Sequence, residues 1–130
     1  MPESNRETKT GSTMAWQTGG TLTFNNPNDV VCHVVGSSAQ KAPGASSWKE
    51  YWVTNTGKVW PQTCQFHQCG NEAQLGAHIY ANQSKENFIL PSCIQCNNDK
   101  SAHYHGSHAF RRSVKMNAVA AWVNRHPNTY

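Results

Sequence analysis

The chain has 130 residues, of which 37% are hydrophobic and 14% are charged, and its formal net charge is +4. A length of this size is typical of one domain. No stretch approaches the roughly 20 apolar residues of a transmembrane helix, and the N-terminal segment MPESNRETKTGSTMAW lacks the apolar run of a signal peptide. We therefore expect no membrane span, and we expect an intracellular protein, either cytoplasmic or nuclear.

The first elements follow from turn residues and β-branched runs. Residues 1–19 are polar and rich in Gly, Ser and Thr, which predicts a flexible N-terminal tail before a single domain over residues 20–130. Thr21–Phe24 alternates in polarity and Val30–Val35 is rich in valine, so both are predicted to be strands on either side of the turn NNPND.

The next segment contains three of the five tryptophans. After a loop over residues 36–47, Trp48–Val53 fits either a strand or a short helix, and we favour a strand. The sequence Asn55-Thr56-Gly57 predicts a hairpin turn, from which Lys58–Trp60 returns. The tryptophans are predicted to supply core rather than to stack on nucleic-acid bases.

Two close pairs of cysteines follow. Cys64 and Cys69 stand in TCQFHQCG, and Cys93 and Cys96 stand in PSCIQCNNDK. Two thiolate pairs separated by a hairpin-sized segment are typical of a tetrahedral structural zinc site. The fifth cysteine, Cys32, lies in the valine-rich stretch VVCHVVG and is predicted to be a buried free thiol. His67, within the first pair, is an alternative ligand.

Each cysteine pair predicts its own local structure. The C-x4-C segment predicts a zinc knuckle, with Gly70 providing the reversed backbone. Leu75–Tyr80 and Phe88–Leu90 predict a hairpin around a polar loop, and Cys93 is predicted to open a helix that carries Cys96 in its first turn. The zinc-binding core is thus predicted to span about residues 60–105.

The C-terminal part of the chain has an uneven charge. Apolar residues at helical spacing, from Phe110 to Trp122, predict a helix over about residues 109–125. Residues 101–130 hold no acidic residue, and their basic residues are Arg111, Arg112, Lys115 and Arg125. This segment is where we expect contact with the phosphates of nucleic acid, unless these charges form only a solvated helix face.

The stretch GAHIY…NFILPSCIQCNNDK, together with the upstream cysteine pair, resembles the HNH/ββα-metal endonucleases. The resemblance covers about residues 64–100. It implies an α+β fold: a small zinc-stabilised treble clef of zinc knuckle, β-hairpin and helix, with the N-terminal strands and the C-terminal helix as additions.

The resemblance also implies roles for individual residues. His78 would be the general base that activates water for attack on a phosphodiester, and Asn97 would bind or orient the catalytic ion. Lys100 would contact phosphate, together with Arg111, Arg112 and Lys115. Zn²⁺ held by the four cysteines would be structural, and Mg²⁺ or another divalent ion would be catalytic.

The chain departs from this family pattern at two positions. Ala77 stands where many members carry a metal-binding Asp. Asn87 lies one residue before the position of the family's middle Asn, which is Phe88 here. Because a slip of one residue reverses the side-chain face in a strand, Asn87 is not predicted to hold the histidine loop. Asp99 and the cluster of His103, His105 and His108 are the nearest alternative metal ligands.

These observations support three hypotheses for function. The first is an HNH-like metal-dependent nuclease with His78 as the base. The second is a non-catalytic zinc-binding treble-clef module that contacts nucleic acid or a protein partner. The third is a small structural protein in which zinc only stabilises the domain. An imidazole of His78 that faces the helix after Cys96 across an open groove favours the first, and burial in apolar packing disfavours it.

Overall fold

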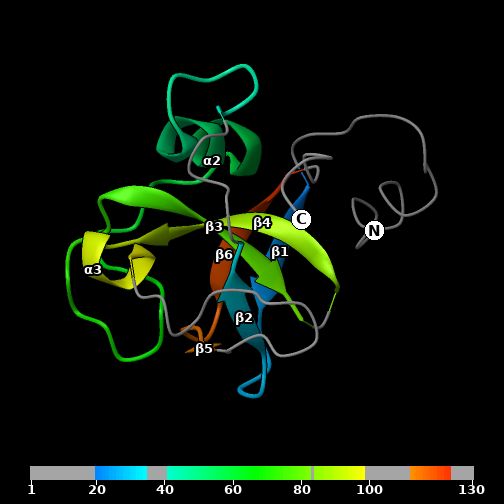
Figure 1. The fold of residues 1–130 in the computed structure, drawn as a ribbon, viewed down its shortest axis with the longest axis vertical. Coiled ribbons are helices and arrows are strands. Elements are labelled where there is room, and N and C mark those ends of the chain that lie inside the picture. The colour runs from blue at the N-terminus through cyan, green and yellow to red at the C-terminus, as the bar shows by residue number, and fades with distance from the viewer. Residues whose placement is uncertain (1–19, 35–40, 83, 99–111, 124–130) are drawn as a thin grey trace.

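The computed structural model describes residues 20–34, 41–82, 84–98 and 112–123. In these residues a curled antiparallel sheet has the strand order β1-β6-β4-β3-β2-β5 (Figure 1). The elements in chain order are β1 (Thr21–Phe24), β2 (Val30–His33), α2 (Trp48–Thr56), β3 (Leu75–Ala81), β4 (Glu86–Ser92), α3 (Ile94–Asn97), β5 (Arg112–Ser113) and β6 (Ala118–Val123). The fold is a small mixed one of strands and helices, and both predicted N-terminal strands are confirmed.

The β3–β4 hairpin is the centre of the sheet and agrees with the prediction. Its register runs from Leu75 opposite Ser92 to Ala81 opposite Glu86. Lys85 adopts a φ of 60° in the connecting loop, and its amide donates to the carbonyl of Ala81 at 2.7 Å. Alternation along these strands divides the sheet into two faces.

Each face carries its own core. On one face Ala77, Ile79, Phe88 and Leu90 pack with Phe66 and with buried cysteines, and we call it the cysteine face. On the other face, the helix face, Tyr51 and Trp52 of α2 pack against the sheet in a second cluster that includes Ile89, Ala121 and Val123. Figure 1 shows α2 on one side of the sheet, with α3 next to the open end of the β3–β4 hairpin.

The predicted strand at Trp48–Val53 is wrong, because this segment belongs to α2. The hydroxyl of Ser47 accepts the amide N–H of Glu50 at 3.0 Å, which caps the N-terminus of the helix. Gly57 ends the helix with a φ of 69° and donates to the carbonyl of Val53. These two caps outweigh the β propensity of the aromatic residues between them.

Helix α2 lies close to the sheet. The hydroxyl of Tyr51 donates to the carbonyl of Trp122 at 2.8 Å, and the indole of Trp52 donates to the carbonyl of Val119 at 3.0 Å. A Cβ atom added at Gly76 of β3 would lie 2.6 Å from Cγ2 of Ile89 and 2.9 Å from Cβ of Trp48. Only glycine at this position permits the close approach of helix and strand.

The tryptophans mainly stabilise this helix-face core, as predicted. The ring of Trp60 packs edge-on against Trp52, with centroids 5.4 Å apart, and its indole donates to the carbonyl of Ala73 at 2.8 Å. Lys58–Trp60 is not a strand, in contrast to the prediction, and Val59 within it is 90% exposed. Side-chain anchoring of Trp60 replaces strand pairing here.

The predicted C-terminal helix is also wrong in the described residues, where the chain forms β5 and β6. Asn117 adopts a φ of 67°, which interrupts any helix between them. Strand β6 lies between β1 and β4 and is buried on both faces. The small side chains of Ala118, Ala120 and Ala121 fit this sheet interior, so tertiary packing overrides the helix propensity of alanine.

Candidate metal centre

The first cysteine pair is held by a short reversal of the chain before β3. The amide of Cys64 donates to the carbonyl of Asn71 at 2.8 Å, and the amide of Cys69 donates to the carbonyl of Phe66 at 3.2 Å. The left-handed residue of this turn is Gln68, with a φ of 63°, and not Gly70 as predicted. The turn brings both sulfur atoms to the same side, as a zinc knuckle does.

The second pair lies where β4 passes into α3. Cys93 follows β4 directly and is the N-cap of α3, and its Sγ accepts the amide N–H of Cys96 at 3.3 Å. The prediction of a helix that opens at Cys93 and carries Cys96 in its first turn is confirmed. Three residues of helix place the Cys96 sulfur on the same side as that of Cys93.

The four sulfur atoms converge. Those of Cys64, Cys69, Cys93 and Cys96 all lie within 4.8 Å of one another. The sulfur of Cys69 lies 3.8 Å from that of Cys93 and 3.8 Å from that of Cys96. A tetrahedron of sulfurs with Zn–S bonds of about 2.3 Å has S–S edges of about 3.8 Å. The cluster is therefore compatible with zinc, and all five cysteines are free thiols.

Hydrogen-bond donors surround these sulfurs. The guanidinium Nη2 of Arg112 lies 3.3 Å from Sγ of Cys96, and the side-chain amide of Asn71 lies 3.7 Å from Sγ of Cys93. Burial raises the pKa of Cys93, but the amide of Cys96 and the side chain of Asn71 outweigh it and lower this pKa to about 7. Burial raises the pKa of Cys96 to about 12 in spite of Arg112. Metal binding at the centre must therefore displace protons.

The side chains of His33 and Lys115 also contact residues of the metal centre. The Arg112 guanidinium lies over the ring of Phe66, 4.3 Å from its centroid, and the ring of His33 lies 5.4 Å from the same centroid. Nε2 of His33 donates to the carbonyl of Cys96 at 2.9 Å. The ammonium of Lys115 donates to the carbonyl of Cys69 at 2.6 Å and to Oγ1 of Thr63 at 3.2 Å.

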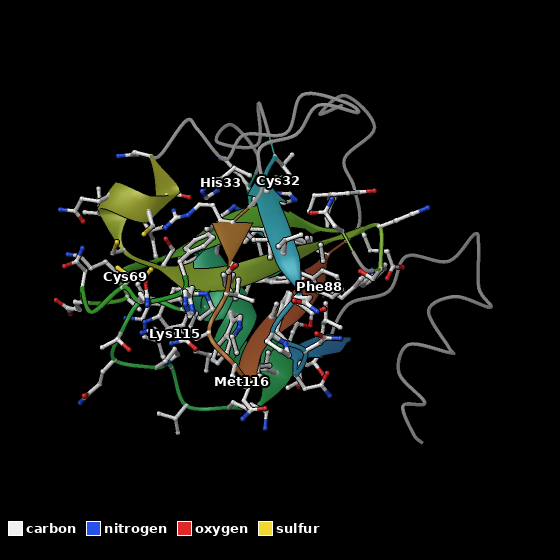
Figure 2. The ribbon with its side chains drawn as sticks, turned by 90° about the horizontal axis from the view of Figure 1, so that it is seen from below. Cys32, His33, Cys69, Phe88, Lys115 and Met116 are labelled. Carbon is white, nitrogen blue, oxygen red and sulfur yellow. The ribbon has the colours of Figure 1, made fainter. Side chains whose placement is uncertain are left out.

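Sequence reasoning did not foresee this arrangement. It identified Arg112 and Lys115 by charge alone and assigned them to nucleic acid. The sequence feature that could have indicated these contacts is an arginine and a lysine three residues apart. They lie in a segment without acidic residues, in a cysteine-rich chain. Figure 2 shows Cys69 and Lys115 on the side of the molecule that carries α3. The contact of Arg112 and Lys115 with nucleic acid stays a prediction.

His67 is not part of the sulfur cluster. Its side chain is exposed, and its backbone amide donates to the carbonyl of Ser113 at 3.0 Å. Within the described part of the chain, the group that can hold a metal consists of four cysteines. Lys100, Arg111, Asp99 and the histidines at 103, 105 and 108 lie outside the described residues.

His78 lies on the helix face, away from the sulfur cluster. Its strand neighbours Ala77 and Ile79 belong to the core of the cysteine face, so alternation directs His78 to the opposite face. The residue is 6% exposed, and its ring lies 5.7 Å from that of Trp48. Burial lowers the pKa of His78 to about 4, so the imidazole is neutral at neutral pH.

Asn87 shares the helix face with His78. His78 lies opposite Ile89 in the hairpin register, and Asn87 lies opposite Tyr80, so the two side chains are diagonal neighbours. Oδ1 of Asn87 and both ring nitrogens of His78 are buried and find no hydrogen-bond partner among the described residues. The comparison with the positions of the HNH motif did not predict that His78 and Asn87 share a face.

Asn97, the other residue with an implied catalytic role, lies in α3 next to Cys96. It is half-buried, and its backbone amide donates to the carbonyl of Cys93 at 3.1 Å. It belongs to the cysteine-bearing helix, whereas His78 lies on the helix face. The described structure therefore places His78 on the helix face and Asn97 beside the cysteine cluster.

Comparisons with protein-family models, curated protein sequences and solved structures find no match to this chain. Among the described residues, no helix has the length and apolar character needed to cross a membrane.

Proposed function

We propose that this protein is a zinc-binding module in which Cys64, Cys69, Cys93 and Cys96 hold one structural Zn²⁺. The observation that carries the proposal is the convergence of four sulfur atoms within 4.8 Å, from two segments that are far apart in the sequence. Four thiolates favour zinc or an iron–sulfur centre over Mg²⁺ or Ca²⁺. A complete set of four protein ligands leaves no open position for a substrate, which is typical of a structural site.

The proposed ion joins segments that also contact one another through the backbone, as where the amide of Gln65 donates to the carbonyl of Pro91 at 3.0 Å. It links the turn at Cys64–Cys69 to the junction of β4 and α3, and Arg112 adds β5 to the same centre. In our proposal the knuckle, the β3–β4 hairpin and α3 form a treble clef. Because the ligand cluster forms only in the folded chain, the free energy of zinc binding is also free energy of folding.

The test is the metal content and the ligand spectrum. Purified protein is expected to contain one zinc per chain by elemental analysis. Replacement by Co²⁺ is expected to give the absorption bands of a tetrahedral thiolate site. Cys93→Ser should abolish both signals, and Cys32→Ser is the matched control that should keep them. Iron in place of zinc, or equal loss in the two variants, would contradict the proposed ligand set.

The module's partner is proposed to be nucleic acid, with a protein as the alternative. The support is the positive charge of residues 101–130, which hold four basic residues and no acidic one. Binding of DNA and RNA oligonucleotides should weaken steeply with salt if phosphates are contacted. Binding that is absent at low salt would direct the search to protein partners.

The HNH-like nuclease is a second candidate, and one observation favours it. His78 and Asn87 are buried diagonal neighbours on one face, and their polar atoms have no partner among the described residues. The burial of His78 and its lowered pKa weigh against a strong general base. In this candidate the site must open to admit a phosphodiester and a divalent ion.

A cleavage assay separates the two candidates. Zinc-loaded protein is incubated with supercoiled DNA, linear DNA and single-stranded RNA, in the presence of Mg²⁺, Mn²⁺, Ni²⁺ or excess Zn²⁺. Cleavage that His78→Gln abolishes, while Asn55→Gln on α2 retains it, would support the nuclease. No cleavage of any substrate by folded, zinc-loaded protein would contradict the nuclease, and the binding module would be the remaining candidate.

A further inference from the structure

One cysteine of the metal centre is less buried than the other three. Cys64 and Cys93 are fully buried and Cys96 is 8% exposed, whereas Cys69 is only partly buried. Cys69 lies on the turn before β3, on the side of the molecule that carries α3 (Figure 2). A dissolved reagent is therefore expected to meet Cys69 before the other three ligands.

The same sulfur lacks the donors that the others have. Sγ of Cys93 accepts from the amide of Cys96 and from Asn71, and Sγ of Cys96 accepts from Arg112. Among the described residues, Sγ of Cys69 has only the neighbouring sulfur atoms within hydrogen-bonding distance. An N–H donor withdraws electron density from a thiolate, so the thiolate without one is the stronger nucleophile.

A positive charge also lies next to Cys69. The ammonium of Lys115 donates to the carbonyl of this residue at 2.6 Å. Partial exposure and the lack of N–H donors to its sulfur thus coincide at one of the four ligands, and the Lys115 ammonium holds the backbone of the same residue.

We propose that Cys69 is the reactive thiolate of the metal centre, and that a peroxide which oxidises it releases the metal. The inference rests on the zinc site proposed above. The Cys69 thiolate attacks one oxygen of hydrogen peroxide, so that an S–O bond forms, the O–O bond breaks and hydroxide leaves. The product is a sulfenic acid, which is a weaker metal ligand than the thiolate.

A second thiolate completes the oxidation. The sulfurs of Cys93 and Cys96 each lie 3.8 Å from that of Cys69. Attack by either one forms a disulfide, breaks the S–O bond and expels a second hydroxide. The two hydroxides take up two protons from the solvent, so that two thiolates are oxidised by two electrons and one peroxide is reduced to two waters. The centre loses two ligands and releases Zn²⁺. The domain then loses the folding free energy that zinc binding contributed.

The experiment uses the full chain with Cys32→Ala, so that every remaining thiol belongs to the cluster. Zinc content is measured first, because a protein without zinc refutes the proposed site and not the reactivity. The zinc-loaded protein is then treated with substoichiometric N-ethylmaleimide, and peptide mass mapping identifies the labelled cysteine. We expect labelling of Cys69 to exceed that of each other cysteine by about 10-fold or more. First labelling at another cysteine, or equal labelling of all four, would overturn the inference.

A variant provides the second readout. Cys69→His keeps four ligands, as in Cys3His sites, and removes the proposed nucleophile. Zinc release by hydrogen peroxide, followed with a colorimetric chelator, should slow by about 10-fold in this variant. An unchanged release rate from zinc-loaded Cys69→His would contradict the proposal. Where this variant binds no zinc, the mass mapping decides alone.

Discussion

The two faces of the sheet differ in the hydrogen-bond partners of their buried polar groups. On the cysteine face, the sulfurs of Cys93 and Cys96 accept N–H donors, and His33 donates to the carbonyl of Cys96. On the helix face, His78 and Asn87 keep buried polar atoms that find no partner among the described residues. An unpartnered buried polar atom costs about 1–3 kcal/mol, so the helix face carries a destabilising polar pair, whereas the cysteine face carries four thiols that could hold a metal ion.

The contrast predicts that the largest loss of stability comes from the cysteine face. Cys93→Ser removes a metal ligand and the sulfur that caps α3, so the domain should lose its cooperative unfolding transition. Zinc-binding free energies are about 10–16 kcal/mol in zinc-finger peptides, which is more than most domains can lose. Thermal and urea unfolding with and without a strong chelator will measure the effect.

Cys32→Ser is the control, because Cys32 is fully buried but lies outside the cluster. We expect it to cost about 1–2 kcal/mol, from the burial of a hydroxyl. A melting curve of the parent protein that a strong chelator leaves unchanged would show that the sulfurs do not hold a stabilising ion.

The second prediction concerns packing on the helix face. Gly76→Ala places a Cβ 2.6 Å from Cγ2 of Ile89 and 2.9 Å from Cβ of Trp48, so α2 must move away from β3. Overpacking of this kind costs about 1–3 kcal/mol. Urea unfolding of zinc-loaded protein will measure the cost.

Gly70→Ala is the matched variant on the cysteine side. A Cβ at Gly70 meets no atom within 4 Å, and the backbone there is not left-handed. Its free energy of unfolding should stay within about 0.5 kcal/mol of the parent protein. Equal costs at the two glycines would mean that α2 does not lie against β3 as described.

The third prediction weakens the metal centre without removing a ligand. Arg112→Met removes the guanidinium that lies 3.3 Å from Sγ of Cys96. Loss of such an outer partner typically lowers metal affinity by about 10–100-fold, which competition with a chromophoric chelator will measure. Lys49→Met causes the same loss of charge on α2, beside Trp60, and should leave the affinity unchanged. A similar decrease in both variants would assign the effect to net charge.

The elements that the sequence predicted correctly are those defined by local signals. The turn at Cys64–Cys69, the β3–β4 hairpin and the helix opening at Cys93 each depend on residues within a few positions of one another. Their cysteine spacing therefore predicted the ligand cluster before any tertiary information. The same reasoning chose Gly70 for the reversed backbone, although Gln68 adopts it.

Some errors arose where distant segments decide the structure, and one arose where local signals were misjudged. The segment Ala118–Val123 has a helix-like composition, but pairing with β1 and β4 makes it a strand. The caps of α2 were visible in the sequence at Ser47 and Gly57, and the aromatic residues between them were given too much weight. The common face of His78 and Asn87 follows from the hairpin register, which a comparison of motif spacing does not contain.

The last prediction uses pH to test whether His78 is buried and unpartnered. Burial lowers its pKa to about 4 in the folded state, against about 6.5 in the unfolded chain. Between these values the unfolded chain binds a proton that the folded chain does not, so stability falls as pH decreases from 6.5 toward 4. The expected loss from this group between pH 7.5 and 5.5 is about 1.3 kcal/mol. His78→Leu should remove that part of the pH dependence, measured by urea unfolding in saturating zinc. Asn87→Leu changes the same face without a titrating group, so it should keep the pH dependence of the parent protein. If His78→Leu instead shows the same decrease as Asn87→Leu, the histidine is already partnered or hydrated, and the contrast between the two faces disappears.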